Sequence, residues 1–234
     1  MPYFKESVTI SPSVLEFLQE VQAKSKGYNI YLGGGYIRDL HVLVHGSVYG
    51  EDLEPKDVDI FVIPQENVSE KFLHLPAKGY VNFIKEAWEI PDMQKRGVSK
   101  VTGTWYKHLE TSNVQFIEYE VFLDIENLAS DMDMYINQCM YSIKDDEFFF
   151  TEGFLTSHKD EVISCAHTYD TVRMYKRYVR MEDKFWWYEV EGKPELGYEE
   201  TIRLADSVNH EGSFCDSDEF DPEISSQSGK ETWN

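Results

Sequence analysis

The spacing of apolar residues predicts a helix near the start of the chain, then a strand, a glycine turn and a second helix. Apolar side chains recur at helical spacing over residues 14–21, after a Ser-Pro-Ser sequence that favours a helix start, and Gly27 ends the pattern. The apolar run NIYL at 29–32 predicts a strand, which the three glycines at 33–35 interrupt. Helical spacing returns at residues 36–44, so the glycines precede a helix start.

Alternation of polar and apolar positions predicts the strands of a sheet further along. Residues 57–63 (DVDIFVI) predict a buried strand with one polar edge, and residues 114–122 (VQFIEYEVF) predict another. Residues 97–107 favour a strand or a hairpin, and residues 147–154 favour a strand. Residues 131–142 fit a helix or a strand, because a short apolar run does not separate the two.

Two further helices and a tail complete the expected elements. Residues 70–89 predict a helix. Residues 170–189 have helical period and form the one strongly basic segment, with Arg173, Lys176, Arg177, Arg180 and Lys184. After Glu211 the chain is acidic with few apolar anchors, which is the composition of a disordered tail.

Composition limits the partners that the chain can have. The 234 residues are 41% hydrophobic, enough for a real core, but 43 acidic residues against 22 basic ones give a net charge of -21. Because this charge repels nucleic acid at long range, we expect no general DNA binding, and any RNA contact must be local. The three cysteines form no C-x-x-C pair, and no apolar segment suggests export or a membrane, so we expect a cytoplasmic protein.

Asp57 and Asp59 are the first candidates for chemistry. Residues two apart on a strand project to one face, about 6.5 to 7 Å from each other, so two carboxylates aim at one point. Mg²⁺ or Mn²⁺ prefers such oxygens, and phosphoryl transfer depends on cations placed in this way. Taken alone, a D-x-D sequence is more often a solvated strand edge. The glycines taken alone are more often a tight turn between a strand and a helix, with Arg38 paired to Asp39 or Glu51 on the surface.

Together these residues resemble a known signature. The sequence LGGGYIRDL followed by KDVDIFVI is similar to that of the polymerase-beta-like nucleotidyltransferases, especially the heads of bacterial-type tRNA CCA-adding enzymes and poly(A) polymerases and short phage-encoded relatives. The resemblance implies an α+β fold, a small mixed sheet flanked by helices. It also implies a triphosphate-binding set, Gly34, Gly35, Arg38 and Asp39, and two metal ligands, Asp57 and Asp59.

Two later segments extend the resemblance more faintly. DMYINQCMYS at 133–142 is similar to the family's D-x-x-x-N-x-x-x-Y segment, and DTVRMYKRYVR at 170–180 is similar to its D-x-x-R-x-x-R helix. The second match implies that Arg173 and Lys176 also bind the nucleotide. Val179 stands where that helix usually offers a third arginine.

This chemistry leads us to expect a third carboxylate as general base or extra ligand. The phage-like pattern favours Asp133 as catalytic residue and metal ligand, because Asn137 and Gln138 follow it as that pattern requires. In the CCA-like reading, Glu120 or Glu118 takes this role and Asp133 positions a helix. An aspartate that only caps a helix is the common alternative.

Other candidates have simpler explanations. Cys165 and His167 lack a second ligand pair at zinc spacing. Glu199, Glu200 and Arg203 could touch a base but have the spacing of an exposed ion pair within a helix. The aromatic run at 185–188 could stack on a base, yet such residues are more often core or interface.

The sequence therefore predicts a metal-dependent nucleotidyltransferase. Its domains are a catalytic head at 1–168, a neck-like helical segment at 169–210 and the acidic tail at 211–234. The expected reaction moves a nucleoside monophosphate from an NTP to a hydroxyl of an RNA 3' end such as that of tRNA. Alternative acceptors are a protein or a small molecule, and a further alternative is a non-catalytic acidic binder. A phage-encoded protein of this kind would act in the host cytoplasm.

Overall fold

The computed structural model describes most of the chain. The described residues are 8–46, 48–50, 53, 55, 57–66, 80–89, 91–106, 109, 113–167 and 170–211. Residues 212–234, nearly all of the expected acidic tail, and residues 70–79 of the expected helix lie outside them.

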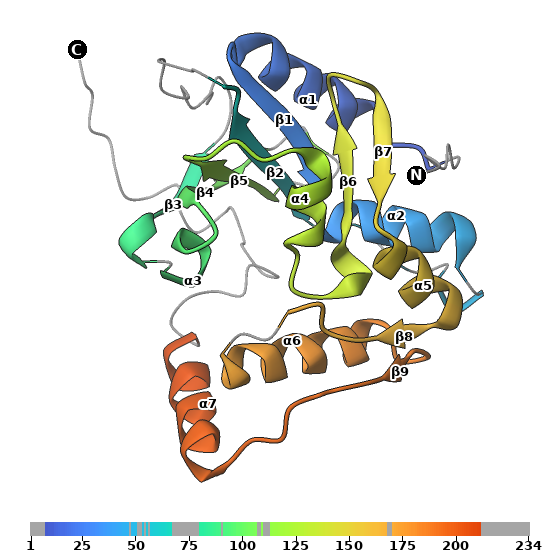
Figure 1. Cartoon of the computed structure of the whole chain (residues 1–234), viewed down its shortest axis with the longest axis vertical. Helices are drawn as coiled ribbons and strands as arrows, with labels where there is room; N and C mark the ends of the chain where they lie inside the picture. Colours follow the sequence, from blue (N-terminus) through green and yellow to red (C-terminus); the bar gives the residue numbers. More distant parts are fainter. Residues whose placement is uncertain are drawn as a thin grey trace, which may run out of the picture.

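A seven-stranded mixed sheet forms the centre of the fold, in the order β3-β4-β5-β2-β1-β6-β7 (Figure 1). Of its neighbouring pairs only β2 and β5 run parallel, and the others are antiparallel. With its flanking helices this sheet confirms the expected α+β class. Its strands are β1 (Tyr28–Gly33), β2 (Asp57–Pro64), β3 (Tyr80–Glu86), β4 (Val98–Trp105), β5 (Asn113–Tyr119), β6 (Cys139–Ser142) and β7 (Glu147–Phe150).

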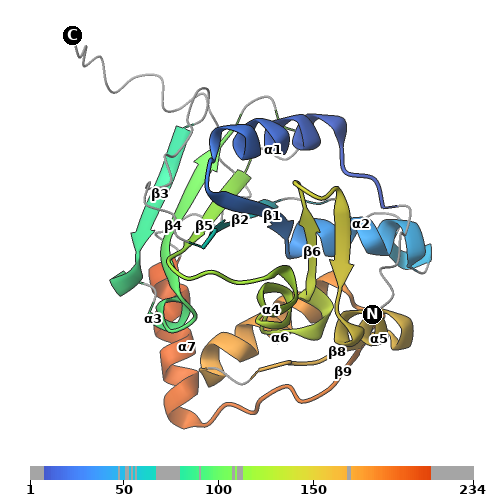
Figure 2. The same ribbon diagram turned by 45° about the horizontal axis from the view of Figure 1, so that its top comes forward.

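Helices cover both faces of the sheet, so alternate residues of β2 enter different cores. The face with Val58 and Ile60 packs on α1 (Pro12–Lys24) and on the start of α2 (Gly35–His45). The face with Phe61 packs on Leu128 of α4 (Ile125–Ser130). Figure 2 shows α1 on one side of the strands and α4 with α6 on the other. Because side chains alternate along a strand, Asp57 and Asp59 share the face of Phe61.

Three helices follow in the C-terminal part of the described chain: α5 (Glu152–Asp160), α6 (Thr171–Lys184) and α7 (Tyr198–Glu211), which packs against α6 (Figure 1). The buried stripe of α6, which includes Tyr178 and Met181, packs on Val42 of α2. A two-stranded parallel pair, β8 (Val162–Ile163) and β9 (Glu189–Val190), brackets this helix in sequence.

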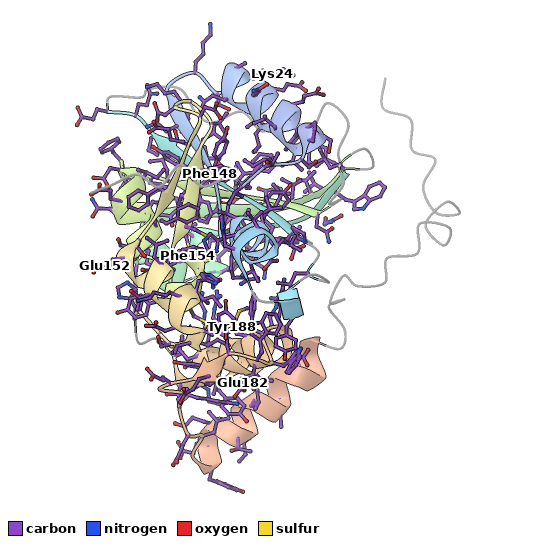
Figure 3. All side chains as sticks on the ribbon, turned by 90° about the vertical axis from the view of Figure 1, so that its right-hand side faces the viewer. Lys24, Phe148, Glu152, Phe154, Glu182 and Tyr188 are labelled. Carbon is purple, nitrogen blue, oxygen red and sulfur yellow. The ribbon has the colours of Figure 1, made fainter. Side chains whose placement is uncertain are left out.

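Aromatic rings link the sheet to the end of α6. Figure 3 shows Phe148, Phe154 and Tyr188 at successive levels from the sheet towards α6. Phe154 meets His158, with ring centroids 4.3 Å apart, and Nδ1 of His158 lies 2.9 Å from the hydroxyl oxygen of Tyr188. This contact fixes the segment after α6 relative to α5.

The strands at 57–63, 97–107 and 114–122 and the helices at the three expected places are confirmed. The helix expected over residues 70–89 is wrong in its described part, where β3 is followed by the 3-10 turn η2 (Ala87–Glu89) and α3 (Pro91–Gln94) begins just beyond. Pairing with β4 decides this, since hydrogen bonds to that strand satisfy backbone groups along one edge of β3.

Each of two other segments contains more than one kind of secondary structure. Residues 131–142 contain the 3-10 turn η3 (Tyr135–Asn137) and then β6, and residues 147–154 contain β7 and the start of α5. Another short 3-10 turn, η1 (Val48–Gly50), follows α2. Among the described residues, no helix is both long and apolar enough to cross a membrane.

Candidate active site

The glycine turn and the aspartate pair lie next to each other, because β1 and β2 are antiparallel neighbours. Gly33 pairs with Asp59 in this ladder, so the turn that follows β1 begins beside Asp59. A Cβ atom built on Gly34 would lie 3.1 Å from Oδ2 of Asp59. Gly34 also has φ +68°, a conformation that side chains rarely adopt. Glycine at this position therefore serves both the turn and the close approach of the carboxylate.

The helix that follows the turn presents its N-terminus at the same place. Gly34 is the N-cap of α2, and its carbonyl oxygen accepts a hydrogen bond from the backbone N–H of Arg38 at 3.1 Å. The first N–H groups of a helix have no partner within the helix, and together with the helix dipole they favour an anion. The start of α2 therefore has the chemistry of an anion site, and it lies beside the Asp59 carboxylate.

The electrostatics of Asp59 match such a position. Burial, together with the neighbouring Asp57, raises the pKa of Asp59 to about 6, although Arg177, Arg180 and Arg38 act in the opposite direction. Two like charges held together in a partly buried place destabilise the ionised state, and a bound divalent cation would relieve the repulsion. The three arginines also show that α6 and α2 direct positive charge towards this carboxylate.

Arg38 is part of a buried network rather than a free cation. Only 4% of its surface is exposed. Its guanidinium donates to Oδ1 of Asp39 at 2.8 Å and to Oδ1 of Asn137 at 2.7 Å, and it lies 5.0 Å from the ring centre of Phe185. The other carboxylate oxygen of Asp39 accepts from Lys184 at 2.6 Å. Arg38 pairs with Asp39 as the simpler reading of the sequence has it, but in the interior and not on the surface.

The Arg38 network also explains why α2 buries polar residues. Its helix lies between the sheet and α6, so Arg38, Asp39 and His41 are buried while Val44 is 48% exposed. Its hydrogen bond to Arg38 ties Asn137 to α2.

Asp133, the favoured third carboxylate, is held by α6. It is 4% exposed, and its Oδ2 lies 2.6 Å from Nε of Arg177. In the part of the chain that the structure describes, no three His, Cys, Asp or Glu side chains are grouped so that they could hold a metal ion. Asp133 is therefore not gathered with Asp57 and Asp59, and its ion pair gives it a way to position Arg177.

The two glutamates offered as alternatives lie elsewhere. Glu118 pairs in register with Val62, on the sheet face opposite to Asp59, and its Oε1 lies 2.9 Å from Nζ of Lys100. Burial raises the pKa of Glu118. Glu120 follows the end of β5 and is exposed. Neither faces the aspartate pair.

The basic residues of α6 form a stripe beside its buried face. Arg173, Arg177, Arg180 and Lys184 follow each other at helical spacings of three or four residues, with Lys176 next to them. Arg173 and Lys176, the nucleotide-binding candidates, are both partly buried. Arg177 and Lys184 take part in the contacts of the site although sequence reasoning assigned neither a role, and Phe185, one of the aromatic residues that could stack on a base, lies over Arg38. For Arg177 and Lys184, their helical spacing on the basic helix α6 could have indicated a place at the site.

The remaining sequence candidates have structural partners. The backbone N–H of Cys165 donates to the hydroxyl of Tyr178 at 3.1 Å, and Nε2 of His167 lies 2.8 Å from the carbonyl oxygen of Ser130. Arg203 of α7 forms an ion pair of 2.6 Å with Asp170, the N-cap of α6, rather than only within its own helix. These contacts hold the C-terminal helices in place.

The donors present fit one hard divalent cation. Asp57 and Asp59 project from one face of β2, and carboxylate oxygens are the ligands that Mg²⁺ and Mn²⁺ prefer. The register of β5 adds amide side chains beside them, with Asn113 paired to Asp57 and Gln115 paired to Asp59. These oxygen donors are of the kind that a hard divalent cation takes, and they lie beside the glycine turn.

Comparison with known proteins gives one family and a group of similar structures. The model of the Gabija anti-defense 2 family protein matches residues 10–160. Among the curated proteins none matches the chain. A CCA-adding enzyme in apo form I has a TM-score of 0.49 and 18% identity, over 88% of this chain and 44% of that one.

Two further solved structures are similar to a comparable degree. The Thermotoga maritima CCA-adding enzyme complexed with tRNA has a TM-score of 0.48 and 18% identity, over 87% of this chain and 43% of that one. The Bacillus stearothermophilus CCA-adding enzyme in complex with CTP has a TM-score of 0.43 and 12% identity, over 86% and 46%. The chain spans less than half the length of each of these structures.

Proposed function

The chain belongs to the Gabija anti-defense 2 family, and we propose that it acts as a metal-dependent nucleotidyltransferase. The proposed reaction moves a nucleoside monophosphate from an NTP to an acceptor hydroxyl and releases pyrophosphate. The observation that carries the proposal is the close approach of Asp59 to the glycine turn, with Oδ2 within 3.1 Å of a Cβ built on Gly34. The helix start favours a phosphate beside this carboxylate, and a divalent cation would join the two negative groups.

Each part of the site has a role in this proposal. Asp57 and Asp59 hold Mg²⁺ or Mn²⁺, which when bound supplies charge neutralisation for the triphosphate and lowers the pKa of the attacking hydroxyl. Gly34 and Gly35 let backbone N–H groups approach the phosphates. Arg38, fixed by Asp39 and Asn137, supports this helix start with positive charge.

The basic stripe of α6 supplies the rest of the positive charge. Arg177 and Arg180 lie close enough to lower the pKa of Asp59. We propose that Arg173, Lys176 and Arg180 contact the nucleotide, while Asp133 orients Arg177 through its buried ion pair. Preorganised charges of this kind stabilise a transferring phosphoryl group without having to reorganise during the reaction.

The acceptor that we favour is a hydroxyl group on a protein of the Gabija defence. The family's name connects it with that defence, and the net charge of -21 disfavours extended contact with an RNA backbone. An RNA 3' end, such as that of tRNA, is the other candidate, and a small metabolite is a third. These acceptors share the same chemistry at Asp57 and Asp59.

A labelled-nucleotide experiment tests the proposal. The protein is incubated with Mg²⁺ and each α-labelled NTP in extracts of cells with and without a Gabija system, and protein, RNA and metabolite pools are separated. We expect label in the protein pool of the Gabija-containing cells, with pyrophosphate released. Label in RNA would reassign the acceptor, and label in metabolites would do the same.

A site variant and a matched control complete the experiment. Asp57→Asn with Asp59→Asn should reduce labelling to background, while Glu120→Gln, an exposed carboxylate beyond β5, should leave it unchanged. Mg²⁺ with NTP should raise the melting temperature of the unmodified protein, since a ligand of the native state stabilises it. Absence of label in every pool, combined with an unchanged melting temperature, would refute the proposal. A raised melting temperature without label would favour a non-catalytic nucleotide binder.

A further inference from the structure

The parallel pairing of β2 and β5 determines which side chains stand beside the aspartates. Asp57 pairs with Asn113 and Asp59 pairs with Gln115. Paired residues of neighbouring strands project to the same face, with the strands about 4.8 Å apart. The amide of Gln115 therefore extends from the same face as the Asp59 carboxylate and directly next to it.

On the other side of β5, strand β4 leaves no open space beside Gln115 on this face. Gln115 pairs there with Gly103 of β4, which has no side chain, but the ring of Phe83 from β3 covers that position. A Cβ atom on Gly103 would lie 2.2 Å from Cε1 of Phe83. In the sheet, position 115 thus stands between the position covered by Phe83 and that of Asp59.

The described acids do not compete for this place. Glu118 lies on the opposite face and pairs with Lys100, and Asp133 pairs with Arg177. The described part of the chain groups no three metal-ligating acids, histidines or cysteines. The residue that pairs with Asp59 on β5 carries a neutral amide.

We propose that Gln115 is the third side chain of the metal site, where its amide oxygen takes the place of a third carboxylate. This inference rests on the proposed function only in placing the cation at Asp57 and Asp59. With two carboxylates the protein neutralises two positive charges, so the cation binds weakly until the triphosphate adds its own oxygens. Affinity for hard cations follows ligand charge, so a glutamate at 115 should tighten binding of the metal alone.

The test measures Mn²⁺ binding to nucleotide-free protein by electron paramagnetic resonance or calorimetry. Gln115→Glu should lower the Kd for Mn²⁺ about tenfold, equivalent to about 1.4 kcal/mol, and Gln115→Leu should raise it. The matched control is Asn113→Asp, which adds the same charge on the same face beside Asp57, two residues from position 115. It should change the Kd by less than Gln115→Glu does.

The outcomes separate this inference from the proposed function. Equal Mn²⁺ affinity in Gln115→Glu, Gln115→Leu and the parent protein overturns it, as does an equal gain in Asn113→Asp, which would indicate charge alone. If the added charge of Gln115→Glu unfolds the metal-free protein, the test is the Kd for Mn²⁺ of Gln115→Leu, which should be higher than that of the parent. Adding Asp59→Asn should remove the Gln115→Glu gain. Nucleotide labelling that persists with an unchanged Mn²⁺ Kd would retain the function and discard the role of Gln115.

Discussion

Replacement of Asp59 by asparagine should stabilise the metal-free protein at neutral pH while abolishing its function. Asp59 is ionised at pH 7 beside Asp57 and partly buried, and both conditions raise its pKa to about 6. Asparagine has nearly the same shape and carries no charge. The variant therefore removes an unfavourable charge and leaves the strand unchanged.

The size of the effect follows from the pKa. Raising it from 3.8 to about 6 corresponds to about 3 kcal/mol of destabilisation once the group is ionised, at about 1.4 kcal/mol for each pKa unit. This is an upper limit, because solvent reaches part of the side chain. The sign follows from linkage: the folded state disfavours ionisation, so stability from this group is complete below pH 3.8 and is lost as the pH rises through about 6. The advantage of the variant should be absent near pH 3.5 and full above pH 7.

Urea denaturation of both proteins between pH 3.5 and pH 8, without divalent metal, gives this difference directly. Asp57→Asn should produce a smaller gain, because it removes the neighbouring charge but leaves Asp59 buried. Addition of Mg²⁺ with NTP should stabilise the parent and not Asp59→Asn. A variant that is equally stable or less stable than the parent at pH 7 would show that Asp59 is not destabilised by its surroundings, and the argument for a cation there would fail.

Three other substitutions test the surrounding structure. Gly34→Ala should lower the free energy of unfolding by about 1 to 3 kcal/mol and remove the nucleotide-induced rise in melting temperature. Gly35→Ala, in ordinary helix geometry, should change the free energy of unfolding by less than about 1 kcal/mol. Similar losses of stability in both variants would contradict the role of the Gly34 backbone conformation. Arg177→Leu should cost about 3 kcal/mol by leaving Asp133 buried and unpaired, and adding Asp133→Leu should recover most of it in urea denaturation; a double variant no more stable than the single one would argue against the pair. Burial and the neighbouring His41 hold the pKa of His158 well below its usual 6.5, so this residue makes the protein less stable as the pH falls below about 6.5. His158→Gln should remove this loss of stability, as measured by melting temperatures at pH 5 and pH 7. An unchanged pH profile in that variant would contradict the assignment.

Local sequence was sufficient for the parts of the site that lie within one turn or one strand. The glycines at 33–35 break an apolar strand and begin a helix, so the turn could be placed from its residues alone. The alternation of Asp57 and Asp59 with apolar residues places both carboxylates on one face of β2. The basic spacing of α6 likewise gave a helix with charge along one side.

Sequence reasoning failed where a neighbour in space decides the outcome. Residues 80–86, predicted as part of a helix, form a strand because β4 pairs with them. Asp133 fits the pattern of a third carboxylate, but its partner Arg177 comes from a helix more than forty residues later in the chain. A buried ion pair between distant segments leaves no spacing signal in either.

The amino-acid sequence by itself determined the strand, the glycine turn, the helix after it and the pair of aspartates, because each depends on backbone conformation over a few residues. The tertiary structure alone decided what stands around them. The parallel register of β2 with β5 sets Gln115 beside Asp59, and the packing of α6 sets Arg177 on Asp133. Register and packing are settled by hydrogen bonds and apolar burial between segments far apart in the chain, and no local pattern records which partner will be chosen.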